Sequence, residues 1–293
     1  MRKSKARRPS LIAALFCLLL PTHPAMGADP APAMYLLELP GDLVPVRYTP
    51  GSLDRAVSVQ DQLGNLIEDF KSWSRAKSAL IVLLLSRDEW QGAGFESEYG
   101  VPEPAGGLGL AMSAFGDDET VELWKGLLGT RLPTQADQPN LGTPEQAASL
   151  AVGDLIALVD AARICLMAGG FTGDQPWVNG VMAHIVALSV LTGHAQVRLP
   201  EVRMVFSALA TNGGGPGAYP LAAAIKPPSL SARLWFEGQY FDAASLVAGG
   251  EGKAPAKAVL KQARKDGGRV RAADLLARYP ELGTWLNTNF RPE

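Results

Sequence analysis

The sequence has little cysteine. Two of its 293 residues are cysteines, Cys17 near the N-terminus and Cys165 far from it. If the N-terminal segment is removed, one cysteine remains and an internal disulfide is excluded, even in an oxidising compartment. Cys165 stands between Ile164 and Leu166. We therefore expect a small buried apolar side chain at this position and not a nucleophile.

Positive charge is also scarce. The chain has 27 Lys and Arg against 29 Asp and Glu. Five of the basic residues and none of the acidic ones lie in residues 1–27, so the rest of the chain has 22 against 29, a net charge of about −7. We see no basic stripe in that part. Because binding to phosphate backbones needs concentrated Lys and Arg, the composition argues against a nucleic acid partner.

A long apolar run is missing as well. The run from Leu11 to Leu20 has ten residues, whereas a helix that spans a bilayer core needs about 20. Basic residues precede this run, Pro21 ends it, and the small-residue pattern Ala25-Met26-Gly27 follows. This order is typical of a signal peptide over residues 1–27. We expect an exported protein, periplasmic or secreted, with no membrane anchor after cleavage; a permanent anchor is the less favoured alternative.

The remaining chain falls into three predicted parts. Residues 28–43 begin with an Ala- and Pro-rich stretch and are predicted to be a leader. Residues 44–130 are predicted to form an α+β subdomain with a small mixed sheet, and residues 143–293 a mostly helical subdomain. Over residues 35–114 the periodicity predicts extended segments at 35–39 and 44–48, a helix over 52–73, and strands over 79–85 and 107–114.

Capping residues and glycines divide residues 143–293 into helices. Thr143-Pro144-Glu145 starts a long apolar helix, or a pair of helices, that ends at Gly169-Gly170. A glycine-rich loop is predicted at 213–217. The other predicted helices cover 176–191, 199–211, 230–247, 255–265, 272–277 and 282–289.

The order of these elements resembles the gluzincin metallopeptidases of the peptidase-MA-like branch. The resemblance covers roughly 44–290 and consists of layout and weak motifs. A strand leads into the acidic and aromatic stretch 83–90, and residues 108–113 correspond to the edge strand above a substrate groove. An apolar helix, a short loop and the Trp177-Val178-Asn179-Gly180 segment occupy residues 158–183. The resemblance implies a groove between two subdomains.

The zinc-binding residues of that family are absent. The resemblance aligns Val159, Asp160 and Arg163 with the His, Glu and His of the His-Glu-x-x-His motif, and Asn179 with the third ligand. A catalytic zinc needs about three good protein ligands, which these residues do not supply. The segment 235–238 is one residue shorter than a Trp-x-x-Glu-Gly signature, and Glu237 as a third ligand would need two partners that the chain does not supply. We predict no catalytic residue, no metal ligand and no cofactor.

Two histidines remain in the part after residue 27. His184 and His194 are ten residues apart, the spacing of the outer histidines in the metzincin motif. However, Ile185 and Leu188 occupy the positions where that motif needs Glu and a middle His. We expect His184 to be a hydrogen-bonded groove or core residue and His194 to be exposed at a helix end.

The preferred hypothesis is an exported, non-catalytic relative of these peptidases that binds a peptide or protein in the former active-site groove. The candidate groove residues are Asp160, Arg163, Trp177, Asn179 and His184. Asp160 and Arg163 are three apart on one helix and are predicted to pair where the zinc would sit. Residues 108–113 would offer an edge for strand addition.

Two alternatives stay open. The first is a hydrolase that uses carboxylates in the same groove, which requires a second acid close to a perturbed one. The second is a structural component of the cell envelope, which predicts a filled groove and an exposed apolar patch elsewhere.

Overall fold

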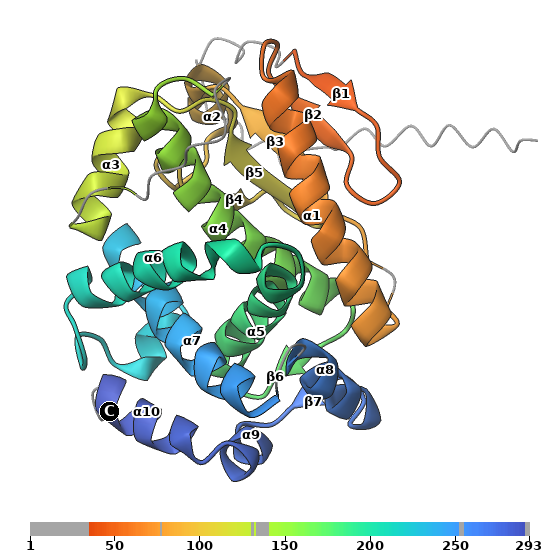
Figure 1. Cartoon of the computed structure of the whole chain (residues 1–293), viewed down its shortest axis with the longest axis vertical. Coiled ribbons are helices and arrows are strands. Elements are labelled where there is room, and N and C mark those ends of the chain that lie inside the picture. The colour runs from red at the N-terminus through yellow and green to blue at the C-terminus, as the bar shows by residue number, and fades with distance from the viewer. Residues whose placement is uncertain (1–34, 77, 130–131, 133–140, 252–254, 291–293) are drawn as a thin grey trace, which may run out of the picture. The chain divides into compact units, whose positions relative to one another are not determined.

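The N-terminal part of the protein forms a five-stranded mixed sheet (Figure 1). The computed structural model describes residues 35–76, 78–129, 132, 141–251 and 255–290. The predicted signal peptide lies outside the described residues. Strands β2, β3 and β5 are parallel, and β1 and β4 are antiparallel edge strands. In spatial order the strands are β1 (Leu37–Leu39), β2 (Val46–Tyr48), β3 (Ile81–Leu85), β5 (Gly109–Ser113) and β4 (Glu103–Pro104).

Side chains alternate across the central strand β3. Val82 and Leu84 are fully buried in the main hydrophobic cluster, which also contains residues of helices α1 (Leu53–Ser74) and α4 (Pro144–Ala168). Leu85 belongs instead to a small second cluster with Trp90. Because successive strand residues point to opposite faces, the aliphatic run is buried on both sides, as a central parallel strand requires.

Two short helices belong to the sheet region. α3 (Asp118–Leu128) begins where the acidic residues 117–119 predict a helix start, and the Asp117 side chain accepts from the backbone N–H of Thr120. α2 (Arg87–Ala93) was not predicted. Strand β3 ends at Leu85, and Ser86 and Glu89 form a capping box that starts α2. The acidic and aromatic stretch at 88–90 therefore lies in a helix.

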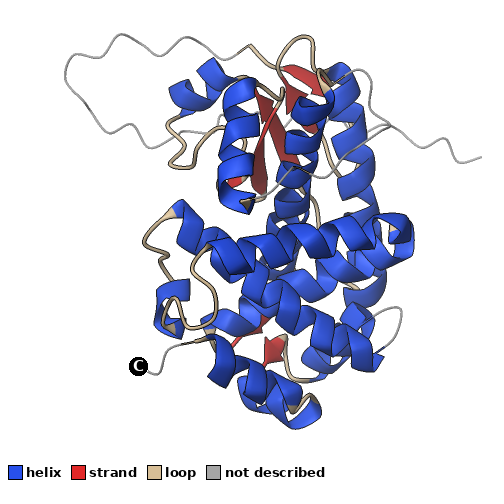
Figure 2. Ribbon diagram, turned by 60° about the vertical axis from the view of Figure 1, so that its left-hand side comes forward, coloured by secondary structure: helices blue, strands red, loops and turns tan. Residues whose placement is uncertain are grey.

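The rest of the described chain is almost entirely helical (Figure 2). Residues 144–168 form one continuous helix, not a pair. The two-residue strands β6 (Thr172–Gly173) and β7 (Arg269–Val270) pair in parallel and join the loop after α4 to the segment before α9. The further elements are α5 (Pro176–His194), η1 (Gln196–Arg198), α6 (Leu199–Asn212), η2 (Leu221–Ala224), α7 (Leu230–Glu251), α8 (Pro255–Lys265), α9 (Ala272–Arg278) and α10 (Glu281–Asn289).

The central helix of this part is α5. It is long and apolar enough to cross a membrane, but 78% of its most apolar window is buried inside the protein. A helix that is apolar all round is expected at the centre of a large core. The main hydrophobic cluster extends from Val44 in the sheet region to Phe290 at the end of the helical region. The predicted α+β class, with a small mixed sheet followed by helices, is confirmed.

Two details of the sequence interpretation need correction. Residues 35–43, assigned to a leader, contain β1, which pairs with β2 in the register Leu37 to Tyr48. Strand β5 is not an edge, because β4 pairs with it through Glu103 and Ala111 and covers the side away from β3. An incoming peptide strand therefore cannot pair along the whole of 108–113, since part of that edge is already hydrogen-bonded.

A buried ion pair fixes α1 against α4. Both Nη atoms of Arg55 donate to the carboxylate of Asp154, at 2.7 and 2.5 Å. The Arg55 side chain is 2% exposed and that of Asp154 is 11% exposed. Because a bidentate pair of this kind satisfies both charges, each partner is tolerated only in the presence of the other.

We expect Asp154→Ala to lower the free energy of unfolding by about 3–5 kcal/mol, because it leaves the Arg55 guanidinium buried without a counter-charge. Urea unfolding followed by circular dichroism measures the change. The double variant Arg55→Met/Asp154→Leu removes both charges and should recover most of the loss. A double variant as unstable as the single one would contradict this account.

Candidate functional site

A network of charged side chains connects the helices α4 and α7. The prediction that Asp160 and Arg163 pair on α4 is confirmed: Nη1 of Arg163 donates to Oδ1 of Asp160. Nη2 of Arg163 also donates to both carboxylate oxygens of Glu237 on α7, at 3.0 and 3.1 Å. Arg163 therefore joins two carboxylates on two helices.

Arg233 extends this network to the sheet region. Its Nη2 donates to Oδ2 of Asp160 at 2.9 Å and to the backbone carbonyl of Pro102 at 3.1 Å. Pro102 immediately precedes β4. Asp160, which is 1% exposed, thus accepts one guanidinium on each oxygen. The network connects α4, α7 and the segment that leads into β4.

His184 on α5 closes the other end of the network. Its Nε2 lies 2.8 Å from Oε2 of Glu237. The ring packs against Phe206, Tyr240 and Phe241, with centroid distances of 5.1, 6.4 and 6.2 Å. Nδ1 is buried and has no hydrogen-bond partner among the described residues. The geometry fits a neutral ring that donates its Nε2–H to the carboxylate.

The protonation states follow from burial and from the arginines. Burial alone would raise the pKa of Glu237, but Arg163 and the hydrogen bond from His184 bring it down to about 2. Burial raises the pKa of Asp160, against the opposing effect of Arg233 and Arg163. Burial lowers the pKa of His184 below its ordinary 6.5. With His184 neutral, the two arginines balance the two carboxylates.

This arrangement is suited to holding helices together. A general acid or base must reach its substrate within hydrogen-bonding distance, yet Asp160 and Glu237 are 1% and 5% exposed and are held by arginines. Among the residues that the structure describes, no three His, Cys, Asp or Glu side chains gather in a way that could hold a metal ion. Two guanidinium groups contact the carboxylates from which such a site would have to be built.

Trp177 and Asn179 stabilise the start of α5. Trp177 is 1% exposed, donates from Nε1 to Oε1 of Gln175 at 3.0 Å, and packs against Trp285. Oδ1 of Asn179 accepts from the backbone N–H of Gly173 at 2.6 Å. Both side chains therefore fix the turn between β6 and α5.

A cavity of about 490 Å³ opens beside the network. Arg163, Thr172 and Asn179 are its polar lining residues, and the side chain of Arg163 is 27% exposed. The other lining residues, from the end of α4, the following loop and the first turns of α5, are Leu166, Met167, Gly170, Phe171 and Met182. Two of the five sequence candidates thus meet at one cavity.

The other three candidates lie in the interior. Asp160, Trp177 and His184 are each 1% exposed, so they do not form the wall of an open groove, as the sequence interpretation had placed them. The reason is that α5 packs directly against both α4 and α7. The second histidine, His194, ends α5 with a side chain 42% exposed and pairs with Asp69 at 2.9 Å.

Sequence reasoning missed two members of the network. The sequence motifs give Glu237 no role, because the chain supplies no partners for it as a metal ligand, and no motif points to Arg233. Their spacing is the signal that could have found them, because Arg233 and Glu237 are four residues apart and so share a face of α7. Charged side chains on that aromatic, mostly apolar face need buried partners.

A scan against protein-family models, a search of curated proteins and a search of solved structures each found no match for this chain. The gluzincin resemblance therefore stays a prediction that depends on the layout and motifs of the sequence.

Asp160→Ala should destabilise the protein by about 3 kcal/mol, because Arg163 and Arg233 then lose a shared buried counter-charge. Thermal and urea unfolding measure the loss. Asp160→Asn keeps an acceptor oxygen and should cost less than the alanine variant. An alanine variant with unchanged stability would show that the network does not hold the helices together.

Stability should also fall as the pH drops below about 6.5, because of His184. The folded state resists protonation of this buried ring while the unfolded state takes up the proton, so the unfolded state binds more protons and stability rises with pH in this window. Each such proton changes the free energy of unfolding by at most about 1.4 kcal/mol per pH unit. His184→Gln should flatten the slope between pH 7 and the folded pKa.

The comparison variant is His194→Gln, which removes a half-exposed histidine instead of a buried one. Urea unfolding across this pH range measures both variants. An equal slope in wild type and His184→Gln would contradict the assignment of a neutral ring.

Proposed function

We propose that this chain is an exported, non-catalytic protein that binds an extended peptide in the cavity beside Arg163. The single observation that carries the proposal is the position of this cavity. It lies at the segment where the sequence resembles the zinc site of gluzincin peptidases, next to carboxylates that arginines already occupy. A binding site remains where the residues for metal chemistry are missing.

The lining of the cavity fits a peptide segment with an apolar side chain. Met167 is 63% exposed at its rim, and Met182 and Phe171 are buried beneath the surface. Methionine side chains are flexible and polarisable and adapt to different apolar groups. Because these methionines can change conformation, the described lining does not have one rigid shape. The cavity would therefore accept a range of peptide sequences and not a single ligand.

Arg163 would supply the polar recognition. A guanidinium has five N–H donors, and the described contacts of Arg163 involve three acceptor oxygens, one on Asp160 and two on Glu237. Donors therefore remain for a backbone carbonyl or a C-terminal carboxylate of the peptide. Asn179 lies at the same cavity, but its Oδ1 is engaged by Gly173.

The geometry gives less support to a carboxylate-based hydrolase. Such an enzyme needs one acid and one base that face a substrate. Asp160 and Glu237 both point into the protein interior and accept from arginines, so neither reaches the cavity that Arg163 lines.

Met167→Lys tests the proposal with little risk to folding, because this side chain is already largely exposed. The immobilised protein is incubated with a tryptic digest of casein, and retained peptides are quantified by mass spectrometry. Replacing the apolar rim by a cation beside Arg163 should reduce retention at least about fivefold, which corresponds to roughly 1 kcal/mol.

The matched control is Met204→Lys, since Met204 is 44% exposed on α6 and does not line the cavity. It should retain peptides like the wild type. Absence of peptide retention by the wild type, or equal loss in both variants, would reject the cavity as a peptide site.

A further inference from the structure

Helix α8 presents a row of lysines to solvent. Lys257, Lys261 and Lys265 are exposed and stand four residues apart, so they follow one side of the helix. The opposite side of α8 is buried in the core through residues such as Val259 and Leu260. The helix is thus fixed to the protein by its apolar side, and its lysines have no role in that packing.

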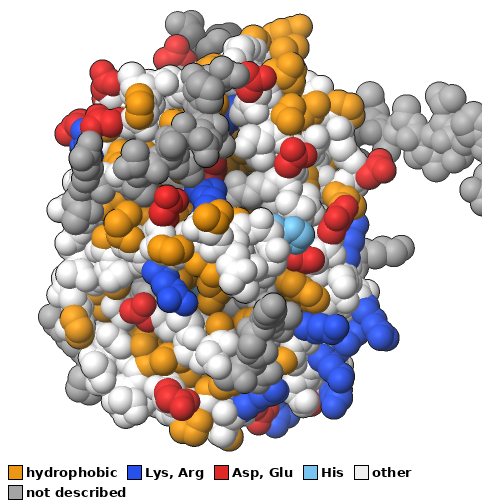
Figure 3. Space-filling model, in the orientation of Figure 1, with side chains coloured by type: hydrophobic (Ala, Val, Ile, Leu, Met, Phe, Trp, Pro, Cys, Tyr) orange, Lys and Arg blue, Asp and Glu red, His pale blue; other side chains and the backbone are white. Residues whose placement is uncertain are grey.

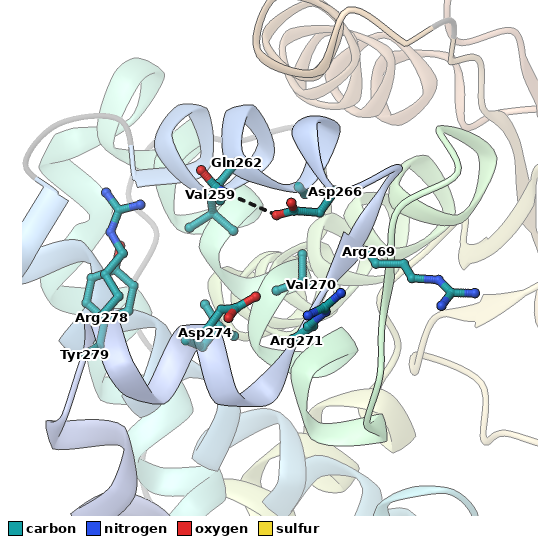
Figure 4. Close-up of a pocket in the computed structure, with 11 residues that line it drawn as sticks. Val259, Gln262, Asp266, Arg269, Val270, Arg271, Asp274, Arg278 and Tyr279 are labelled. Carbon is teal, nitrogen blue, oxygen red and sulfur yellow. Dashed lines mark hydrogen bonds between the residues drawn. The ribbon is translucent and has the colours of Figure 1, made fainter.

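The positive charge continues beyond α8. Arg269 in β7 and Arg271 directly after it are exposed, and Arg278 lies at the end of α9. Figure 4 shows these three arginines around the pocket between α8 and α9, together with Asp266 and Asp274. We call the set the basic face; it consists of Lys257, Lys261, Arg264, Lys265, Arg269, Arg271 and Arg278.

The charge of this face differs from that of the rest of the chain. Residues 255–278 contain seven Lys and Arg and two Asp, a net charge of +5, whereas the remaining residues have 20 basic and 27 acidic side chains, a net charge of −7. Figure 3 shows Lys and Arg gathered at the lower right, where Figure 1 places α8. The expectation that no basic stripe exists is therefore wrong: the seven basic residues lie close together in the sequence, and α8, β7 and α9 leave most of their side chains exposed.

Nothing in the described chain neutralises most of this charge. Six members of the basic face, all except Arg278, form no ion pair with any described residue. Like charges four residues apart on a helix destabilise it by a few tenths of a kcal/mol per pair. The arrangement therefore lowers stability slightly and gains from an external anionic surface.

We propose that the basic face docks the protein on a membrane that contains anionic phospholipids. A bilayer is a flat array of negative charges, and each Lys or Arg near it contributes favourably within a Debye length. A protein with one basic face and an otherwise acidic surface is attracted to such a plane in a single orientation. This inference does not depend on what the cavity beside Arg163 binds.

Nucleic acid is the less favoured anionic partner. Proteins that bind single strands without sequence preference stack bases on aromatic side chains, and residues 255–278 contain no Phe, Trp or Tyr. The nearest aromatic residue along the chain, Tyr279, is 5% exposed. The described face thus offers charge alone, which suits lipid headgroups.

Docking of this kind does not involve insertion into the bilayer. The apolar side of α8 is already used in the protein core, so it is not available to acyl chains. Binding through exposed charges alone must weaken as salt shortens the Debye length, from about 10 Å at 0.1 M to about 3 Å at 1 M.

Co-sedimentation with vesicles tests the proposal. The full chain is mixed with vesicles of phosphatidylcholine alone and with vesicles that also contain phosphatidylglycerol. We expect binding to the second kind only, with loss of binding near 1 M salt. Each basic residue near the membrane contributes about fivefold to the affinity. The double variant Lys257→Glu/Lys261→Glu should therefore weaken binding by about 25-fold or more.

The matched control is Arg203→Glu/Lys226→Glu, which reverses two exposed basic residues outside the basic face and changes the net charge equally. This control should bind the phosphatidylglycerol vesicles at least five times more tightly than Lys257→Glu/Lys261→Glu does. Circular dichroism melting verifies that both variants fold.

Three outcomes would overturn the proposal: equal binding to both kinds of vesicle, equal losses in the two double variants, or retention of a DNA duplex by the wild type without binding to anionic vesicles.

Discussion

The helical part of this protein depends on the need to satisfy buried charges where α4, α5 and α7 meet. Asp160 receives a guanidinium on each oxygen, and Glu237 receives Arg163 and the ring of His184. Removal of any one partner leaves a charge in a medium that solvates it poorly, so the three helices are fixed in one relative position. The same network reaches the sheet region through Pro102, and the buried pair of Arg55 with Asp154 adds a second connection between the two regions.

This constraint also limits what the site can do. Carboxylates that are buried and held by arginines are poor general bases and poor metal ligands, because their lone pairs are already engaged. Of the charged network among the described residues, Arg163 alone lines the cavity at the end of α4. The protein thus combines a closed, charge-balanced interior with an open, partly apolar cavity. The basic face on α8, β7 and α9 is separate from both, and six of its seven residues, all except Arg278, form no ion pair with any described residue.

Most of the fold could be predicted from local patterns. The helices α1, α4, α5, α6 and α8 begin or end within a few residues of their predicted positions because caps, prolines and glycines act locally. Other elements could not be predicted: α2 depends on one capping box next to an aliphatic strand, and the two-residue strands β4, β6 and β7 carry no periodic pattern. For the site, the spacing of Asp160 and Arg163 predicted their pair, but Glu237 is 74 residues from Arg163 in sequence.

By itself the sequence determined the α+β order of elements, the burial of Cys165, and the absence of the zinc-ligand residues from the aligned positions, because these follow from residue type and short spacing. Only the tertiary structure decided which buried charges are partners, which candidate residues reach a cavity, and that most basic side chains of residues 255–278 are exposed. The physical reason is that charge pairing and surface exposure depend on contacts between segments far apart in the chain. Those contacts are fixed by the packing of the whole core and not by any local pattern.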